Sequence, residues 1–229
     1  MECFYYRGQK CKHCDSVVPV FGLGHHKPKD EGEDQFTKTV INFYEYGNRR
    51  ERDYLLQNFI NLFKERFEGD IQFDAVCVVP TREKDGVNPN MQAFAQEFAV
   101  AIGVPYGQAI RRNRAIKGQH ELDDKDERLE NVRGSIDVAE DVKGKSILVL
   151  DNLCISGASA WATFDALREA GAKEVYFMVF GLGSKGRECD FDINPAFPGK
   201  ASQIVAKWHW PKVSKEKREV YAKEKKDGL

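Results

Sequence analysis

The chain has 229 residues, of which 41% are hydrophobic and 31% are charged, and its formal net charge is −1 at pH 7. This length gives room for one domain with a full hydrophobic core. No apolar run reaches the roughly 18 residues of a membrane span, and the N-terminus lacks the apolar core of a secretory signal, so we expect a cytoplasmic protein. The near-neutral charge argues against bulk electrostatic binding of nucleic acid, although a local basic face is compatible with it. The composition does not decide between a monomer and a homo-oligomer.

The first 35 residues show no helical or strand periodicity, so we expect an irregular N-terminal segment. It carries Cys3, Cys11 and Cys14, which could form a four-ligand structural zinc site together with His25 or His26. Only one C-x-x-C pair is present, whereas a zinc ribbon has two, so a metal-free segment is the simpler interpretation. Without a secretory signal, disulfides are not expected.

Helix and strand patterns alternate in the next part of the chain. Residues 49–67 repeat apolar side chains with helical spacing, which predicts an amphipathic helix. Residues 74–80 form a short apolar run that ends in a proline, which predicts a buried strand. The apolar positions from Met91 to Ile102 again have helical spacing, so a second helix is expected after that strand.

A basic loop joins the predicted strand to the second helix, and it contains Thr81, Arg82 and Lys84. Two cations at the end of a strand could offset the charge of a bound anion. The alternative is a surface turn with solvated charges, and the loop alone does not decide between the two interpretations.

Residues 106–134 have no apolar strand pattern of their own over most of their length. The stretch 119–136 within and just after this segment reads QHELDDKDERLENVRGSI. From the residue types alone, it is a charged, exposed helix that Asp123 caps.

The most informative stretch is 146–159, which reads SILVLDNLCISGAS. Its apolar residues predict a strand buried on both faces, with Asp151 at the carboxyl end. Small residues then form a turn, after which Ala158, Trp161 and Ala162 begin a helical pattern. A helix N-terminus after such a turn offers unpaired N–H groups to a phosphate, and serine hydroxyls add donors. The alternative is an ordinary strand–helix turn with a well-capped helix.

A G-x-G-x-x-G pattern at Gly181, Gly183 and Gly186 follows the strand predicted over 174–180. A dinucleotide site would need a helix at this point and an acidic residue about 20 positions later. The sequence offers neither, so we reject this interpretation.

The strand, acid, turn and helix of residues 146–159 resemble the signature of the type I phosphoribosyltransferases. The acidic pair of that family reads Asp151-Asn152 here, and the resemblance makes these the catalytic residues that hold the ribose hydroxyls of phosphoribosyl pyrophosphate (PRPP). In this chain Asn152 replaces a carboxylate, and the first residue of the family's phosphate loop has lost its hydroxyl. That loop, Thr-Thr-Gly-Ala-Thr in the family, wraps the 5′-phosphate and here consists of Ile155, Ser156, Gly157, Ala158 and Ser159.

Two further blocks resemble the ComF branch of this family, and the resemblance as a whole runs from about residue 48 to residue 183. Gln119, Arg128 and Asn131 match the flap of that branch, and the resemblance implies that residues 106–134 form this mobile flap. Asp85 stands where the branch has an arginine. The branch's pyrophosphate loop corresponds to the basic loop with Thr81, Arg82 and Lys84.

The resemblance implies an α/β fold with a doubly wound parallel sheet, a flap and an irregular N-terminal extension. We expect residues 1–35 to form the Cys/His-containing segment, 36–211 a phosphoribosyltransferase-like domain and 212–229 a charged tail. The implied function is to bind PRPP with Mg²⁺ and to transfer the phosphoribosyl group to a nitrogenous base or a related acceptor. The alternative is a non-catalytic module that binds PRPP, another sugar phosphate or a nucleotide, with the ComF resemblance suggesting a role in DNA uptake or DNA handling.

Overall fold

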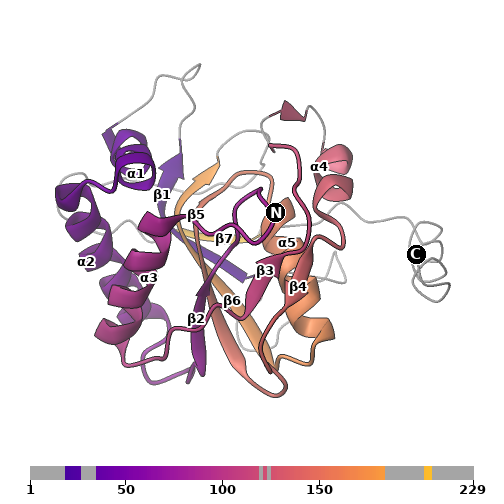
Figure 1. Cartoon of the computed structure of the whole chain (residues 1–229). Helices are drawn as coiled ribbons and strands as arrows, with labels where there is room; N and C mark the ends of the chain where they lie inside the picture. The colour runs from indigo at the N-terminus through magenta and orange to yellow at the C-terminus, as the bar shows by residue number, and fades with distance from the viewer. Residues whose placement is uncertain (1–18, 27–34, 119–120, 123–124, 184–203, 208–229) are drawn as a thin grey trace, which may run out of the picture.

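The structure is a computed structural model, and it describes residues 19–26, 35–118, 121–122, 125–183 and 204–207. Figure 1 shows a sheet with helices on both of its sides. In chain order the elements are β1 (Pro19–His26), α1 (Gln35–Tyr46), α2 (Arg49–Arg66), β2 (Ala75–Val78), α3 (Pro89–Ile102), β3 (Ile110–Arg112), α4 (Lys125–Val132), β4 (Ile136–Val138), β5 (Ser146–Cys154), α5 (Ala158–Glu169), β6 (Glu174–Gly183) and β7 (Ile204–Lys207).

A five-stranded sheet with the order β2-β5-β6-β1-β7 forms the centre of the fold. The pairs β2–β5, β5–β6 and β6–β1 are parallel, whereas β7 runs antiparallel to β1 at one edge. Parallel neighbours need a crossover, and α5 supplies it between β5 and β6. β3 and β4 pair separately as a two-stranded antiparallel ribbon. The predicted doubly wound α/β fold is therefore confirmed.

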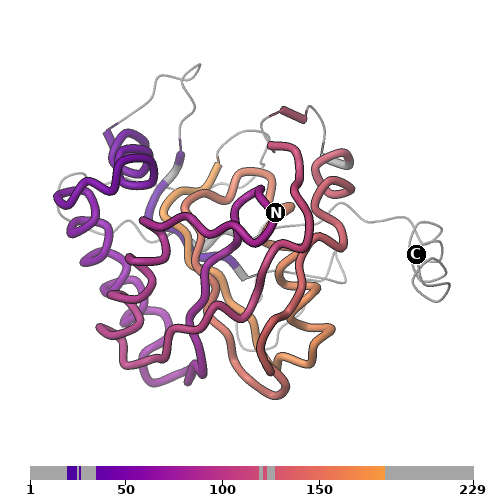
Figure 2. The backbone as a smooth tube through the Cα atoms, viewed as in Figure 1, coloured from indigo at the N-terminus to yellow at the C-terminus, as the bar shows by residue number. Residues whose placement is uncertain are grey.

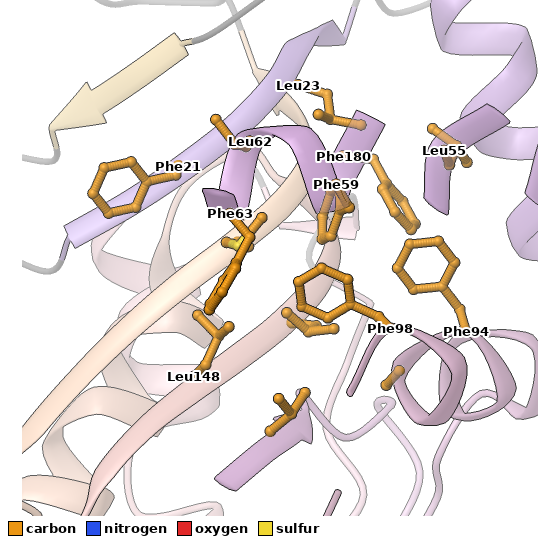
Figure 3. Packing of buried hydrophobic residues seen from close by; sticks show 14 of the residues in the cluster. Phe21, Leu23, Leu55, Phe59, Leu62, Phe63, Phe94, Phe98, Leu148 and Phe180 are labelled. Atoms are coloured by element: carbon orange, nitrogen blue, oxygen red, sulfur yellow. The ribbon is translucent and has the colours of Figure 1, made fainter. Parts of the chain in front are cut away.

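One face of the sheet is covered by α1, α2 and α3 through an aromatic core (Figure 3). The Phe59 ring of α2 lies 5.3 Å from the Phe94 ring of α3 and 4.8 Å from the Phe180 ring of β6, measured between centroids. Phe94 and Phe180 meet edge to face at 4.9 Å. Each such pair contributes roughly 0.5–1.5 kcal/mol to stability beyond the burial of its apolar area, so the pairs stabilise the packing of the helices on this face.

The opposite face packs against α4 and α5 through smaller side chains. Figure 2 shows the same division along the chain, with the indigo-to-magenta helices on one side and the later, orange helix on the other. Val149 and Phe177 point to this face, whereas their neighbours Leu148 and Met178 point to the aromatic one. This alternation is the period of two that a strand imposes, and it explains why β5 and β6 are continuous apolar runs.

Most of the predicted elements occur where the sequence indicates them. The helix predicted over 49–67 is α2, and the strand predicted over 74–80 is β2 in its central part. α3 begins after Asn88, whose side chain accepts a hydrogen bond from the Met91 N–H at 3.0 Å. β6 continues through Gly183, so the first two glycines of the rejected dinucleotide pattern lie within a strand.

The N-terminal segment differs from its predicted irregular form, because residues 19–26 form β1. This strand lies inside the sheet, in parallel register with β6 from Val20↔Phe177 to His26↔Gly183. The boundary predicted at residue 35 therefore separates β1 from the sheet to which it belongs. The glycines of β1 weaken its strand pattern in the sequence. Close packing requires glycine at position 24, because a Cβ there would lie 2.7 Å from a ring carbon of Phe36 in α1.

The segment predicted as a flap is also more ordered at its start than expected. Ile110–Arg112 forms β3, which pairs with β4 in the register Ile110↔Val138. Asp123, the expected helix cap, lies outside the described residues, and α4 begins at Lys125. Within the described part of the chain, no helix has the length and apolar character needed to cross a bilayer.

Candidate functional site

Two loops of interest meet at the carboxyl edge of the sheet, because β2 and β5 are parallel neighbours. The strands pair in register as far as Val78↔Leu150, and the Val79 N–H then donates to the Leu150 carbonyl at 2.9 Å. The loop that follows β2 and the acidic residue that follows Leu150 therefore start side by side. In parallel α/β sheets ligands bind at this edge, outside the carboxyl ends of the strands.

Asp151 lies at this edge, half-buried, and burial raises the pKa of its carboxyl from the ordinary 3.8 to about 7. Two smaller influences oppose the rise in pKa. The Asn152 N–H donates to Asp151 Oδ1 at 2.8 Å, and the positive charge of Arg112 favours the ionised carboxylate. A carboxyl in this state can exist in either protonation form near neutral pH, which is a frequent property of functional sites.

Asn152 presents a donor to the site, because its oxygen is already bound. The Leu153 N–H donates to Asn152 Oδ1 at 2.8 Å. An N–H group can pair only with the oxygen of the amide, so this contact fixes which way the amide faces. Among the described residues, no acceptor meets Asn152 Nδ2, so the NH₂ group keeps both donors for a ligand.

The predicted phosphate loop lies between β5 and α5. β5 continues as far as Cys154, which is buried, and the chain then turns through Gly157, which has a φ of 78°. The left-handed conformation suits glycine, since other residues are strained there. The N–H groups at the start of α5 have no intrahelical acceptor, as at every helix N-terminus, and such groups can bind an anion.

The side chains of this loop differ in what they offer to an anion. Ser156 and Ser159 are half-buried, and Ser156 Oγ accepts a long hydrogen bond of 3.4 Å from the Ala158 N–H. Ile155 is 39% exposed, so an apolar side chain occupies the position where the family has a hydroxyl. Its Cα would lie 3.0 Å from a Cβ on Gly183, so this part of the loop packs against the end of β6.

The predicted pyrophosphate loop with Thr81, Arg82 and Lys84 lies within residues 80–86, which are closed by their own backbone. The Thr81 N–H donates to the Gly86 carbonyl at 2.8 Å, and the Gly86 N–H donates to Glu83 at 3.1 Å. Within the described residues, the N–H groups of Arg82, Glu83 and Lys84 meet no acceptor. Three successive amide donors in an exposed loop can therefore hydrogen-bond an anion.

The two cations predicted for this loop are both exposed but differ in their partners. Arg82 pairs with Glu83 at 3.3 Å and with Glu121, from the flap segment, at 3.1 Å. Lys84 forms no ion pair with any described residue. Exposed pairs contribute only about 0–1 kcal/mol, so a polyanionic ligand can displace the two carboxylates from Arg82.

The structure also brings Arg112, which the sequence does not indicate, to the site. Its side chain is 1% exposed and donates to the Thr81 carbonyl, and the charge of Asp151 acts on it. Burial lowers the pKa of the guanidinium to about 10. An arginine in a basic stretch is usually solvated, so only the inward position in β3 could have indicated its role.

Tyr44 of α1 is a second residue that the sequence does not indicate. Burial raises the pKa of its hydroxyl, and the negative charge of Asp151 adds to the rise. The side-chain amides of Asn88 and Asn90 donate to the Tyr44 carbonyl at 3.3 and 3.0 Å, which attaches α1 to the start of α3. α1 therefore contributes to the same edge of the sheet.

The predicted flap residues bind backbone groups in the structure. Arg128 donates twice to the Leu122 carbonyl, at 3.0 and 2.8 Å. Asn131 accepts from the Lys117 N–H at 3.1 Å and donates to the Lys117 carbonyl at 2.9 Å. These contacts hold the segment before α4 against the helix. Gln119 lies outside the described residues.

Metal ligation by protein side chains alone finds no support in the described part of the chain, where no group of three or more His, Cys, Asp or Glu residues could hold an ion. Cys3, Cys11 and Cys14 lie outside the described residues. His25 lies in β1, where its backbone is in register with Leu182. The zinc site therefore stays a prediction.

The structure is that of an α/β protein with a carboxylate and a helix N-terminus near the carboxyl edge of its parallel sheet. The sequence comparison supports homology to the type I phosphoribosyltransferases: the chain is 30% identical to the amidophosphoribosyltransferase of Saccharomyces cerevisiae over 118 residues, which are 51% of this chain and 21% of that protein. It is 26% identical to the enzyme of Methanothermobacter thermautotrophicus over 83 residues, 36% of this chain and 18% of that protein. The chain thus spans about a fifth of the length of these curated relatives.

Solved structures of the same kind resemble the chain at low identity. A hypoxanthine-guanine phosphoribosyltransferase from Bacillus anthracis has 15% identity and a TM-score of 0.42, over 61% of this chain and 75% of that one. The glutamine PRPP amidotransferase from B. subtilis has 20% identity and a TM-score of 0.40, over 61% of this chain and 30% of that one. No protein-family model matches the chain.

Proposed function

We propose that this chain is a PRPP-utilising phosphoribosyltransferase whose site lies at the carboxyl edge of β2 and β5. One observation carries the proposal: the N-terminus of α5 and the amide-rich loop 80–86 both adjoin the strand ends beside Asp151. PRPP has an anionic group at each end of a sugar, so it suits a site with two potential anion-binding elements near a carboxylate. The similarity to amidophosphoribosyltransferases supports the same class.

Each element has a role in the proposed reaction. The 5′-phosphate accepts hydrogen bonds from the first N–H groups of α5 and from Ser156 and Ser159. Ionised Asp151 accepts hydrogen bonds from the ribose hydroxyls. Arg82 and Lys84 offset the charge that develops on the leaving pyrophosphate.

The proposed transfer is balanced as a substitution at C1′ of the ribose. The bond from C1′ to the pyrophosphate oxygen breaks, and its electron pair leaves on the pyrophosphate. The lone pair of the acceptor nitrogen forms the new bond to C1′. The N–H proton that the acceptor then loses passes to solvent.

Mg²⁺ fits this site as an ion that arrives with the ligand. Asp151 Oδ2 is the one carboxylate oxygen of the acidic pair that no described donor meets, and Asn152 has no carboxylate to add. Mg²⁺ commonly binds through one or two carboxylates together with substrate phosphates. When bound in this way, it would supply positive charge at the pyrophosphate.

The acceptor and the branch of the family are finer proposals. The order Gln119, Arg128 and Asn131 supports a ComF-like branch. The names of the similar proteins include adenine, hypoxanthine-guanine and amido transfer, so we take adenine, hypoxanthine, guanine and ammonia as the first acceptors to test.

A second candidate function is a non-catalytic module that binds PRPP or a nucleotide as a signal. The observation that favours it is the donor at Asn152, because an amide NH₂ can hold a ligand oxygen but adds no negative charge to stabilise an oxocarbenium-like transition state. Ile155 also removes one hydroxyl from the phosphate loop.

Calorimetric titration with PRPP, in the presence and absence of Mg²⁺, tests the shared binding site first. Saturable binding that Asp151→Ala abolishes is the expected result. Pyrophosphate release with any acceptor of the panel then identifies a transferase, whereas binding without release identifies the signalling module. Absence of binding at millimolar PRPP would overturn both candidates.

A further inference from the structure

Arg112 is a buried cation that contacts the pyrophosphate loop from beneath. Its Nε donates to the Thr81 carbonyl at 2.7 Å, its Nη2 to the Pro80 carbonyl at 3.4 Å and its Nη1 to Ser135 Oγ at 2.5 Å. Ser135 Oγ in turn donates to the Val132 carbonyl at 2.6 Å. The guanidinium thus connects the start of the loop to the end of α4.

The backbone of the same residue holds the other end of the loop. The Arg112 carbonyl accepts from the Asp85 N–H at 2.9 Å. Asp85 has a φ of 54°, a left-handed conformation that a non-glycine residue keeps only where its surroundings impose it. Arg112 therefore fixes residues 80–81 through its side chain and residue 85 through its main chain, and the exposed amides lie between these points.

Hydrogen bonding to neutral groups does not account for a charged side chain at this position. Within the described residues, every hydrogen-bond acceptor of the guanidinium is a carbonyl or a hydroxyl, and no carboxylate forms an ion pair with it. A neutral donor could bond the same groups without the cost of burying a charge. The negative charge of Asp151 favours the cation to some extent. An anion bound above the loop would add a second attraction, because the two charges interact through a medium of low polarity.

We propose that Arg112 is a positioning residue, which keeps the loop 80–86 in the shape that binds pyrophosphate and places a permanent positive charge beneath that anion. The identity of the anion rests on the proposed function, whereas the control of loop shape does not. Ribose 5-phosphate lacks the pyrophosphate group, so substitution of Arg112 should not change its binding affinity.

The test compares Arg112→Gln, Arg112→Lys and the matched control Arg111→Gln. Arg111 is the neighbouring residue of β3, its side chain is 57% exposed, and it pairs with Asp137 at 3.7 Å. Each Gln variant removes one positive charge, but only Arg112→Gln removes it from beneath the loop. Thermal unfolding shows first which variants are folded, and Arg112→Lys retains the charge if the Gln variant does not fold.

Inorganic pyrophosphate and ribose 5-phosphate are the calorimetric probes. We expect Arg112→Gln to weaken pyrophosphate binding about tenfold or more, with Arg112→Lys in between and Arg111→Gln unchanged. Ribose 5-phosphate should bind all four proteins alike. Equal losses for both probes would reduce Arg112 to a purely structural residue, and unaltered pyrophosphate binding by folded Arg112→Gln would overturn the proposal.

Amide hydrogen exchange separates this proposal from the proposed function. Arg112→Gln should speed exchange at Asp85 and Gly86, and Arg111→Gln should not. If the unmodified chain binds neither probe, the proposed function fails, but faster exchange would still establish the positioning of the loop. Unchanged exchange in folded Arg112→Gln would refute that positioning whatever the chain binds.

Discussion

The Leu153 N–H and the Asn152 side-chain oxygen lie 2.8 Å apart, so Asn152 turns its NH₂ group away from its own backbone. The acidic residue that the family has at this position would face the ligand with a second oxygen instead. A single substitution of carboxylate by amide therefore changes one acceptor at the site into a donor. Position 152 is therefore the place at which we expect the two proposed functions to differ.

Asn152→Asp should restore the missing charge and oxygen. The carboxylate would still accept from Leu153 with one oxygen and would offer the other to a ribose hydroxyl or to PRPP-bound Mg²⁺. We expect PRPP affinity in Mg²⁺ to rise about tenfold, which corresponds to one charge-assisted contact of roughly 1.4 kcal/mol. In a transferase, pyrophosphate release should rise as well, whereas in a signalling module only the affinity should change. Weaker PRPP binding by the variant would contradict the assigned role of position 152.

The raised pKa of Asp151 makes folding stability depend on pH. Its pKa of about 7 in the folded state lies above the ordinary 3.8, so the unfolded chain ionises first as the pH rises. The stabilising contribution is complete below about pH 4 and is lost as the pH approaches 7, at up to about 1.4 kcal/mol per pH unit.

Urea denaturation between pH 4 and 8 measures this slope. Asp151→Asn, which cannot ionise, should reduce it. The matched control is Asp53→Asn, because 54% of the Asp53 side chain is exposed, and this variant should leave the slope in place. Equal slopes for Asp151→Asn and the unmodified chain would show that Asp151 titrates normally.

Gly157→Ala should weaken both folding and phosphate binding. At a φ of 78° a side chain costs about 1–2 kcal/mol, and relieving the strain would move the first N–H groups of α5. Gly103→Ala is the control, since Gly103 has a φ of 70°, has no neighbouring atom within 4 Å of an added Cβ and ends α3 away from the loop. Both variants should lose similar stability by thermal unfolding, but only Gly157→Ala should lose affinity for ribose 5-phosphate. Equal affinity in both variants would argue against the phosphate loop.

Gly24→Ala tests the place of β1 in the core. The new methyl group would lie 2.7 Å from Phe36 Cε1, a separation that packed atoms do not adopt, so strand or helix must shift. Overpacking of this kind costs about 1–3 kcal/mol in the free energy of unfolding. Denaturation that is unchanged by the substitution would mean that β1 does not pack against α1.

The sequence predicts the elements around the site well because their patterns are local. A continuous apolar run followed by small residues indicates β5 and the start of α5, and the spacing of apolar residues indicates α2 and α3. The acidic pair and the phosphate loop follow from the same stretch, 146–159. The faces that these elements bury agree with their patterns.

Prediction from the sequence fails where tertiary contacts override the local preference for a helix or a strand. β1 contains Gly22 and Gly24, which weaken a strand pattern, yet the close approach of Leu182 and Phe36 requires both. Along β3, Ile110 and Arg112 are buried and Arg111 between them is exposed, which is the alternation of a strand. No pattern rule, however, places an arginine on the buried face. The direction of the Asn152 amide depends on a hydrogen bond and has no signal in the residue order.

The position of β1 also constrains how the chain is made. β1 is the first described strand to leave the ribosome, but its parallel neighbour β6 follows more than 150 residues later. At about 5–20 residues per second, β1 waits on the order of ten seconds or more with its hydrogen-bonding groups unpaired. Closing so long a loop is slow, so the sheet is completed late in folding. During synthesis, the part of the chain that holds α2, β2 and α3 must therefore remain soluble before β6 is made and completes the core on this face.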